Sequence, residues 1–317
     1  MSKVVVVGGG VIGCAVAERL TLDGHHVTLL ERDQLGCRAS GAAAGELSPQ
    51  TAGSRADESA IHSLELFPEL IARIEHDTTI DVEYRVQQGL RAALDEKEAV
   101  ALRAGGGRWL DAQACRQAEP ALSPDILGAL LLEHAHLTPA RFVRALAMAA
   151  ASRGADIREG TPVIGFELAS GEVRAVITAS GEYEADWTVI AAGPWSKEVA
   201  STAGVEVDVR PQRGQLAALE PVSMVLRHSL FWSTGYLVPK ADGTIIAGGT
   251  EEDSGFDDRP TVAGVATLLE LARRLVPSLV AAMGPPNLII ATGHHRKGIL
   301  LAPLAATQGA ALIAGAR

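Results

Sequence analysis

Three glycines near the start of the chain, Gly8, Gly10 and Gly13, follow the spacing Gly-x-Gly-x-x-Gly. This spacing suits a turn that holds a pyrophosphate. The first glycine allows the turn, the second lets backbone approach the ligand, and the third lets a helix pack closely on a strand. An acidic residue, Glu31, lies 18 positions after Gly13, near where a ribose-binding acid is expected. The alternative is a glycine-rich turn that binds nothing, and the complete pattern favours a bound dinucleotide.

The residues around these glycines predict the elements that must position them. Residues 4–7 are four consecutive valines, which indicates a short strand buried on both faces. Residues 11–22 carry apolar side chains at helical intervals, and residues 26–30 form a second apolar strand that ends at Glu31. The phosphates would then lie against unpaired N–H groups at the positive end of the helix.

Other reactive side chains do not form a recognisable catalytic set. The chain has no spacing typical of a nucleophile with its base, and no metal-ligand spacing. His25 and His26 are adjacent, as are His294 and His295, so the members of a pair cannot both face one metal from a strand, and neither pair has a third partner. The sequence therefore predicts no metal site, and no residue is assigned as catalytic.

Composition limits the class of protein and its partners. The 317 residues are 47% hydrophobic and carry a net charge of −10, which suits a folded globular protein and argues against a nucleic-acid or anionic-membrane partner. The three cysteines have no paired framework, which fits a reducing cytoplasm, and Cys14 is expected to be a small buried residue. Residues 4–7 are too short for a signal peptide. The apolar run 298–316 holds Pro303 and Gln308 and is interpreted as a buried helix, not a membrane span.

The remaining chain predicts two interleaved domains in an α/β protein. Helices are expected over residues 57–74, 111–119, 138–153 and 259–276, and strands over 82–94 with a break at Gln88-Gly89, 127–133, 155–158, 162–168, 172–179, 182–185, 187–192 and 287–291. Residues 207–249 are strand-rich. The predicted fold is a Rossmann-like nucleotide-binding domain (residues 1–82, 138–206 and 287–317) interleaved with a mainly antiparallel-sheet α+β substrate domain (83–137 and 207–286).

A second stretch of small residues, Ala39-Ser-Gly-Ala-Ala-Ala-Gly45, follows the second strand. As a purely structural feature it is the start of a helix capped by Ser40. Next to a nucleotide site, it is interpreted as a second helix terminus that faces the same anionic ligand.

Six motifs together resemble one family. They are Gly8-x-Gly10-x-x-Gly13 with Glu31, Ala39 to Gly45, Ala191-Ala-Gly-Pro-Trp-Ser196, Arg213-Gly-Gln215, Tyr236-Leu-Val-Pro239, and Gly293-His-His-Arg-Lys-Gly-Ile-Leu-Leu-Ala-Pro303. The order and span of these motifs are similar to those of the FAD-dependent amino acid oxidases, which include glycine oxidase, D-amino acid oxidase and sarcosine oxidase. The second and last motifs look most like the glycine oxidases of thiamine biosynthesis.

The resemblance implies FAD as the cofactor. It implies that the pyrophosphate lies on the glycine turn, the adenosine ribose on Glu31 and Arg32, and the flavin and ribityl chain on the small-residue stretch. It places the backbone of Val163 against adenine and the start of the last helix on the pyrimidine side of the flavin. The implied cofactor-binding residues are Gly8, Gly10, Val11, Ile12, Gly13, Glu31, Arg32, Ala39, Ser40, Ala44, Gly45, Glu46, Val163, Gly193, His294, His295, Arg296, Lys297, Gly298, Ile299 and Leu300.

The resemblance also implies a reaction, the oxidation of an amine next to a carboxylate with hydride transfer to flavin N5 and reduction of oxygen to hydrogen peroxide. Its substrate would be glycine, sarcosine or a small D-amino acid, bound by Tyr236 and Arg296. Tyr236 could instead be a strand residue half in the core, and Arg296 a surface residue. Glu251 stands at an apolar pocket position of the family, where its carboxylate would repel the substrate carboxylate, attract the ammonium, or face solvent. A homo-oligomer is left open.

One departure from the family concerns its Gly-Leu-Arg-Pro motif, whose arginine grips the substrate carboxylate. Here Met283 runs directly into Gly284, and a shorter piece near residues 105–107 is also missing. Either the protein lacks this arginine, or the printed sequence omits a segment that the protein has. Three hypotheses therefore stay open: an amino acid oxidase, an FAD-linked dehydrogenase that uses an acceptor other than oxygen, and a catalytically impaired flavoprotein.

Overall fold

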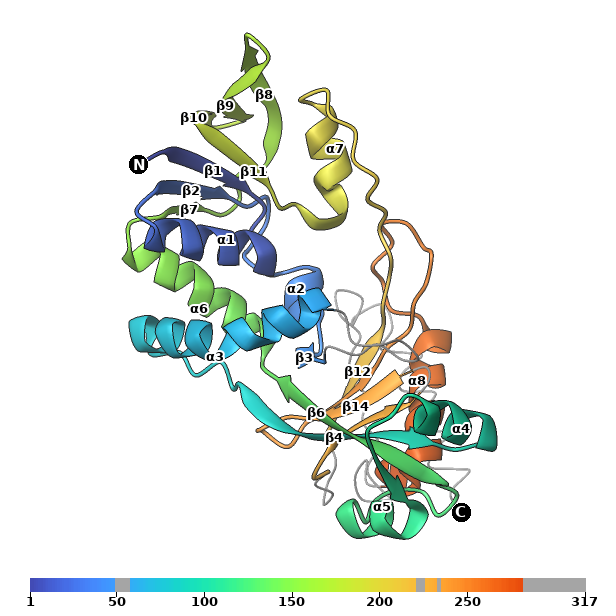
Figure 1. Ribbon diagram of the computed structural model, residues 1–317. Helices are drawn as coiled ribbons and strands as arrows, with labels where there is room; N and C mark the ends of the chain where they lie inside the picture. Colours follow the sequence, from blue (N-terminus) through green and yellow to red (C-terminus); the bar gives the residue numbers. More distant parts are fainter. Residues whose placement is uncertain (49–57, 221–225, 233–234, 282–317) are drawn as a thin grey trace, which may run out of the picture.

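The computed structural model describes residues 1–48, 58–220, 226–232 and 235–281. The described part contains two regions joined through strands β4 and β6 and the segment around helix α2 (Figure 1). One region holds a parallel sheet with the N-terminal strand, and the other a larger, mainly antiparallel sheet. The predicted α/β fold class is confirmed. The predicted domain boundaries stay a prediction.

The parallel sheet has the strand order β11-β1-β2-β7. Val4 in β1 pairs with Val27 in β2 and with Trp187 in β11. All four valines of β1 are buried, as the apolar run predicts for a strand covered on both faces. The elements of this region are β1 (Lys3–Val7), α1 (Val11–Leu22), β2 (His26–Leu30), α3 (Glu58–Thr78), α6 (Pro139–Ser152), β7 (Asp156–Arg158) and β11 (Trp187–Ile190).

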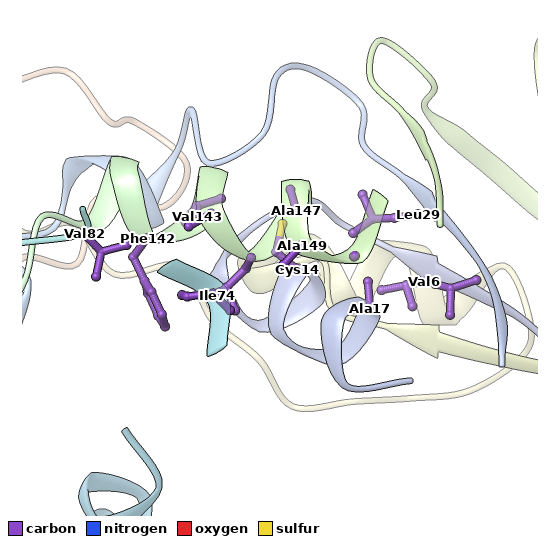
Figure 2. Close-up of a cluster of buried hydrophobic side chains, with 14 of the residues drawn as sticks. Val6, Cys14, Ala17, Leu29, Ile74, Val82, Phe142, Val143, Ala147 and Ala149 are labelled. Atoms are coloured by element: carbon purple, nitrogen blue, oxygen red, sulfur yellow. The ribbon is translucent and has the colours of Figure 1, made fainter. Parts of the chain in front are cut away.

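Helices α1 and α6 cover one face of the parallel sheet, and α3 packs against α6 (Figure 1). Figure 2 shows the core between them, where Val6 and Leu29 of the sheet meet Cys14 and Ala17 of α1, Ile74 of α3 and several residues of α6. Cys14 is fully buried, as predicted, and burial raises the pKa of its thiol to about 12. The alanines of α6 let this helix lie close to α1, which fixes the start of α1 relative to the sheet.

A small antiparallel sheet covers the other face of the parallel sheet. Phe166 and Val176 of this sheet pack against Val5 and Val7 of β1. A short turn and helix then follow β11. The elements are β8 (Val163–Ala169), β9 (Glu172–Thr178), β10 (Gly181–Glu184), the 3-10 turn η1 (Gly193–Trp195) and α7 (Ser196–Ser201).

The large sheet has the order β12-β15-β14-β13-β4-β6-β3, with β5 paired to β6. Among the pairs of described strands in this sheet, β13–β4 is the parallel one. The elements are α2 (Ala39–Ala42), β3 (Glu46–Leu47), β4 (Arg85–Ala93), α4 (Glu96–Ala104), β5 (Arg108–Asp111), α5 (Ala112–Ala118), β6 (Gly128–His136), β12 (Leu216–Leu219), β13 (Ser229–Trp232), β14 (Gly235–Pro239), β15 (Ile245–Gly248), α8 (Val262–Leu275) and α9 (Pro277–Ala281).

The two faces of this sheet differ. On one face, Leu90, Leu230, Leu237 and Ile245 pack with Leu275 of α8 in a second core. The opposite face carries the alternate residues of the same strands, because successive side chains in a strand point to opposite sides. It holds a smaller apolar cluster of Leu130, Leu132 and Phe231, packed against Tyr236.

Several elements differ from the prediction: for example, β6 continues to His136, and helix α4 was not predicted. Strand β4 runs through Gly89 without the predicted break. The glycine is needed there for packing, because the Cβ of any other residue would lie 2.8 Å from the Phe231 ring. Helix α3 continues four residues beyond the predicted end. Helix α8 begins at Val262, where Thr261 caps it by accepting a hydrogen bond from the Gly264 N–H. The predicted strand 287–291 and the apolar run 298–316 lie outside the described residues.

Candidate functional site

The glycine turn is shaped by close backbone contacts. Gly8 has a φ of +110°, and a side chain there would lie 2.4 Å from the Ala191 carbonyl oxygen. A side chain at Gly13 would lie 1.9 Å from the Gly8 carbonyl oxygen. The protein itself therefore requires glycine at both positions, whether or not a ligand is bound. These contacts hold the beginning of α1 directly against the ends of β1 and β11.

Gly10 differs from these two glycines because it leaves open space. A side chain there would meet only the Ser40 hydroxyl, at 3.1 Å, and the backbone φ of −76° suits any residue. Ser40 accepts a hydrogen bond of 3.0 Å from the Val11 N–H, so the small-residue stretch contacts the first turn of α1, whereas the N-cap position of α2 is Arg38 and not the expected Ser40. Ile12 beside it is 65% exposed. Open space at a helix start and an uncovered apolar side chain suit a bound pyrophosphate with its carbon chain.

Glu31 is held in a fixed position at the end of β2. Its carboxylate accepts hydrogen bonds from the Gly9 N–H at 2.6 Å and from the Asp33 N–H at 2.7 Å. A carboxylate in this position has lone pairs left for the hydroxyls of a ribose. The structure thus brings Glu31 next to the glycine turn, where the spacing predicted it.

These residues line a first cavity of about 500 Å³. Arg32 forms part of its wall and places its guanidinium carbon 4.3 Å from the centre of the Trp195 ring. The predicted cofactor-binding residues on the walls are Gly8, Gly10, Val11, Ile12, Glu31, Arg32, Ala39, Ser40, Val163 and Gly193. Trp195 also lines the cavity, although only its motif was noted in the sequence.

A second cavity of about 770 Å³ lies between the α2 segment and the large sheet. Ala39 lines both cavities, so one small residue forms a shared wall. Tyr236 and Glu251, both predicted to bind substrate, line the second cavity together with Glu46. Burial, and then the nearby Glu46 carboxylate, raise the pKa of Tyr236 above its usual value. The Tyr236 hydroxyl therefore stays protonated and can donate a hydrogen bond at neutral pH.

Glu46 is positioned by the large sheet. It lies in β3, and its Oε1 atom is 2.9 Å from Nδ1 of the buried His134 on β6. His136, two residues further along β6, is also buried, and burial with Lys240 and His134 nearby lowers its pKa to about 4. Ionisable groups from β3 and β6, and Lys240 just after β14, thus lie close together near this wall of the cavity.

The predicted residues Ala44 and Gly45 have structural contacts and lie outside the walls of both cavities. The Ala44 carbonyl accepts a 2.5 Å hydrogen bond from the Lys240 ammonium. Gly45 has a φ of +76°, and a side chain there would lie 2.1 Å from the Leu137 carbonyl oxygen. Both residues therefore fix the path of the chain between α2 and β3.

The motif Arg213-Gly-Gln215 supports the segment that carries Glu251. Arg213 forms a 2.6 Å ion pair with Glu252, and the Gln215 side-chain amide donates to the same carboxylate at 2.5 Å. Hydrogen bonds from Thr250, Arg213 and Gln215 lower the pKa of Glu252 to about 2. Because Glu252 is anchored in this way, the adjacent Glu251 is held at the edge of the second cavity.

Sequence reasoning missed Arg91, which also lines the second cavity. It lies between Leu90 and Ala92, which face the core on the other side of the sheet. The alternation of apolar and charged residues over 90–92 was a usable signal for an inward-facing arginine. The alternation was hard to recognise because Arg91 is followed by three apolar residues in a row, Ala92, Ala93 and Leu94.

The predicted residues His294, His295, Arg296, Lys297, Gly298, Ile299 and Leu300 lie outside the described residues, so their roles stay predictions. Among the residues that are described, no three acidic, histidine or cysteine side chains lie together in a way that would hold a metal. In the described ranges, no helix combines the length and apolar character needed to cross a membrane.

The fold and the first cavity define a protein that binds a dinucleotide at the carboxyl ends of parallel strands. The chain belongs to the FAD dependent oxidoreductase family (DAO), which matches residues 3–312. FAD is therefore its cofactor and the chain is an FAD-dependent oxidoreductase, which confirms the predicted family, cofactor and enzyme class. The open space at Gly10, the exposed Ile12 and the fixed Glu31 fit the adenosine and pyrophosphate half of FAD.

Relatives agree along nearly the full chain. The chain is 34% identical to the bifunctional protein ThiO/ThiG of Nostoc sp. over 98% of its own length, but it spans only 52% of that relative. It is 32% identical to the glycine oxidase of Pseudomonas putida, over 100% of this chain and 96% of that protein. The structure of glycine oxidase from Geobacillus kaustophilus superposes with a TM-score of 0.83 at 29% identity, covering 99% of this chain and 95% of that one.

Proposed function

We propose that this chain oxidises the amine of glycine, sarcosine or a small D-amino acid and passes the electrons to oxygen, which gives hydrogen peroxide. The observation that carries the proposal is the second cavity, which shares the Ala39 wall with the cofactor cavity and holds Tyr236 and Glu251. Relatives named glycine oxidase support it. The relatives named ThiO/ThiG support the predicted role in thiamine biosynthesis.

The chain's own residues would bind and orient the substrate. When bound, FAD supplies the hydride acceptor and the site that reacts with oxygen. The protonated Tyr236 hydroxyl would donate a hydrogen bond to the substrate carboxylate. Glu251 would attract the substrate ammonium across the same cavity. Alignment of the substrate C–H bond is the main catalytic requirement of such a reaction, and fixed groups on opposite walls provide it.

Anaerobic mixing tests this proposal. The FAD-loaded protein is mixed with glycine, sarcosine or D-alanine, and the absorbance of oxidised flavin is followed. We expect the flavin to be reduced by at least one of these amino acids and peroxide to form stoichiometrically when oxygen is admitted. A flavin that no small amino acid reduces would contradict the proposal and support a catalytically impaired flavoprotein.

A dehydrogenase is separated from an oxidase by the acceptor. If the reduced flavin reacts slowly with oxygen but rapidly with an artificial dye, the acceptor in the proposal is wrong while the amino acid oxidation stands. A cytoplasmic location and a homo-oligomeric state stay predictions. We also propose the division into a cofactor domain and a substrate domain, since the two cavities lie against different sheets.

A further inference from the structure

The loop that joins β15 to α8 extends from the large sheet toward the region of the parallel sheet (Figure 1). Near its start, Thr250 and Glu251 line the second cavity. Further along, residues 253–259, which we name the strap, reach the first cavity, because Phe256 of the strap stacks on the wall residue Trp195. One loop thus connects the walls of the two cavities.

Two contacts join the strap to the wall of the first cavity. The centres of the Phe256 and Trp195 rings lie 5.3 Å apart, with 25° between the ring planes, which is a favourable separation for an aromatic pair. Asp258 of the strap forms an ion pair of 3.2 Å with Arg38, another wall residue. Trp195 also contacts the guanidinium of Arg32, which lines the same cavity. Phe256 and Asp258 themselves are not among the described wall residues, so they act on the cavity through Trp195 and Arg38.

Arg213 holds the strap on the side of the large sheet. Its guanidinium donates hydrogen bonds of 3.1 Å to the backbone carbonyls of Asp257 and Arg259, and it forms a 2.6 Å ion pair with Glu252. Hydrogen bonds from a charged donor are stronger than neutral ones. Arg213 therefore fixes the backbone on both sides of Asp258, which sets the position of Phe256.

The position of Phe256 is not explained by burial in the fold. The residue is 47% exposed, and it belongs to none of the buried core clusters that the described residues form. Its contact instead fixes a large side chain of the cavity wall. A binding site whose side chains are already ordered binds more tightly, because less conformational entropy is lost when the ligand arrives. In the cofactor cavity, the side chain ordered in this way is that of Trp195.

We propose that the strap preorganises the first cavity for FAD, with Phe256 as a positioning residue that holds Trp195 in the cavity wall. Arg213 acts one step further away, by holding the strap. The proposal concerns the cofactor and not the amino acid, so it stands or falls independently of the proposed function. Its consequence is that residues from the region of the large sheet raise the affinity of the protein for FAD.

Serial dilution of the FAD-loaded protein tests the proposal, because the recovery of free-flavin fluorescence gives the dissociation constant for FAD. In Phe256→Ala we expect this constant to rise about 2- to 12-fold. The range corresponds to about 0.5–1.5 kcal/mol for ordering one side chain on binding, at about 1.4 kcal/mol for each tenfold change. Phe256→Tyr keeps the ring and should bind FAD as the wild-type protein does. Val262→Ala is the control, because Val262 lies just beyond the strap and is 90% exposed.

A double-mutant cycle tests the role of Arg213. Arg213→Met alone should raise the dissociation constant for FAD within the same range, since the strap loses its backbone hydrogen bonds. In the double variant with Phe256→Ala, the second substitution should add little, because both substitutions act through the same contact with Trp195. Fully additive effects would contradict the part assigned to Arg213.

A role of Phe256 in stability alone would give a different result. Phe256→Ala would then lower the free energy of unfolding of the FAD-free protein and leave the dissociation constant for FAD at the wild-type value, which would overturn the proposal. If Phe256→Ala does not fold, Phe256→Leu, which keeps an apolar side chain without the ring, is compared with Phe256→Tyr. Weaker FAD binding in Phe256→Leu than in Phe256→Tyr supports the proposal, and equal affinities overturn it.

Discussion

Substitution of Gly10 by alanine should separate cofactor binding from folding. The backbone at Gly10 suits alanine, and the added methyl group would meet only the Ser40 hydroxyl oxygen, at 3.1 Å, a contact that a shift of this side chain by a few tenths of an ångström would relieve. Alanine also reduces the conformational freedom of the unfolded chain, which stabilises a protein by about 0.4–1 kcal/mol where the conformation is compatible. We therefore expect the free energy of unfolding of the FAD-free protein to stay the same or rise slightly.

The same methyl group should weaken FAD binding. Gly10 lines the first cavity at the start of α1, so its methyl group would project into the space in which backbone approaches the pyrophosphate. Loss of one hydrogen bond from backbone to a charged phosphate costs about 1.5–3 kcal/mol. At about 1.4 kcal/mol for each tenfold change, the dissociation constant for FAD should rise about 10- to 150-fold.

The assay combines two measurements on FAD-free protein. Titration with FAD, followed by the quenching of flavin fluorescence, gives the dissociation constant, and urea unfolding followed by circular dichroism gives the stability. Gly165→Ala in β8 is the control, because nothing lies within 4 Å of the added methyl group. It should leave the dissociation constant for FAD unchanged and, like Gly10→Ala, leave the stability the same or slightly higher.

Gly13→Ala provides the contrast. Its methyl group would lie 1.9 Å from the Gly8 carbonyl oxygen, so α1 must move and the FAD-free protein itself should lose about 1–3 kcal/mol or more. Wild-type FAD affinity in Gly10→Ala would refute the proposed path of the pyrophosphate. A loss of stability in Gly10→Ala as large as in Gly13→Ala would refute the claim that Gly10 is open.

Two further predictions concern stability. Because the pKa of His136 is lowered to about 4, the unfolded chain, with a histidine pKa of about 6.5, takes up more protons between these values, so stability should fall by up to about 3 kcal/mol as pH drops from 6.5 to 4. Urea unfolding measured across this pH range should show a smaller loss of stability in His136→Gln than in the wild-type protein. An unchanged pH profile would contradict the assignment of this loss to His136. Glu18 is buried and pairs with Arg73 at 3.0 Å and Arg153 at 2.9 Å, so Glu18→Leu should cost about 3–5 kcal/mol by the same unfolding assay. Glu69→Leu, which removes an exposed partner of the same Arg73, should cost less than about 1 kcal/mol, and equal losses would refute the role of burial.

The cofactor half of the site could be predicted from the sequence because its signals are local. The four valines, the three glycines and Glu31 lie within one consecutive strand, turn, helix and strand. Their contacts are mainly with residues of this same segment. The structure places Glu31 within hydrogen-bonding distance of the Gly9 N–H, as the spacing requires. Val163 and Gly193 were less certain from sequence, yet both line the same cavity. Val163, at the start of β8, packs on the cluster that holds Val5 and Val7 of β1, and Gly193 follows β11, which pairs with β1.

The substrate half depended on pairings between distant segments. Gly89 looks like a strand break in the sequence, but in the structure it makes room for Phe231 on a strand far along the chain. The role of Arg213-Gly-Gln215 likewise became clear only through its contacts with Glu252 and Thr261. Propensity describes one segment at a time, whereas these contacts are set by sheet register.

The sequence by itself therefore determined the dinucleotide turn, the α/β class and, through its ordered motifs, the family and FAD. Hydrogen bonding and packing within a few residues of each other were sufficient for the turn. Only the tertiary structure decided which groups face the second cavity, because the two faces of β4 become distinct only when α8 covers one of them. That choice buried Leu90 in the core and placed Arg91 on the wall of the cavity that Tyr236 also lines, where the substrate is proposed to bind.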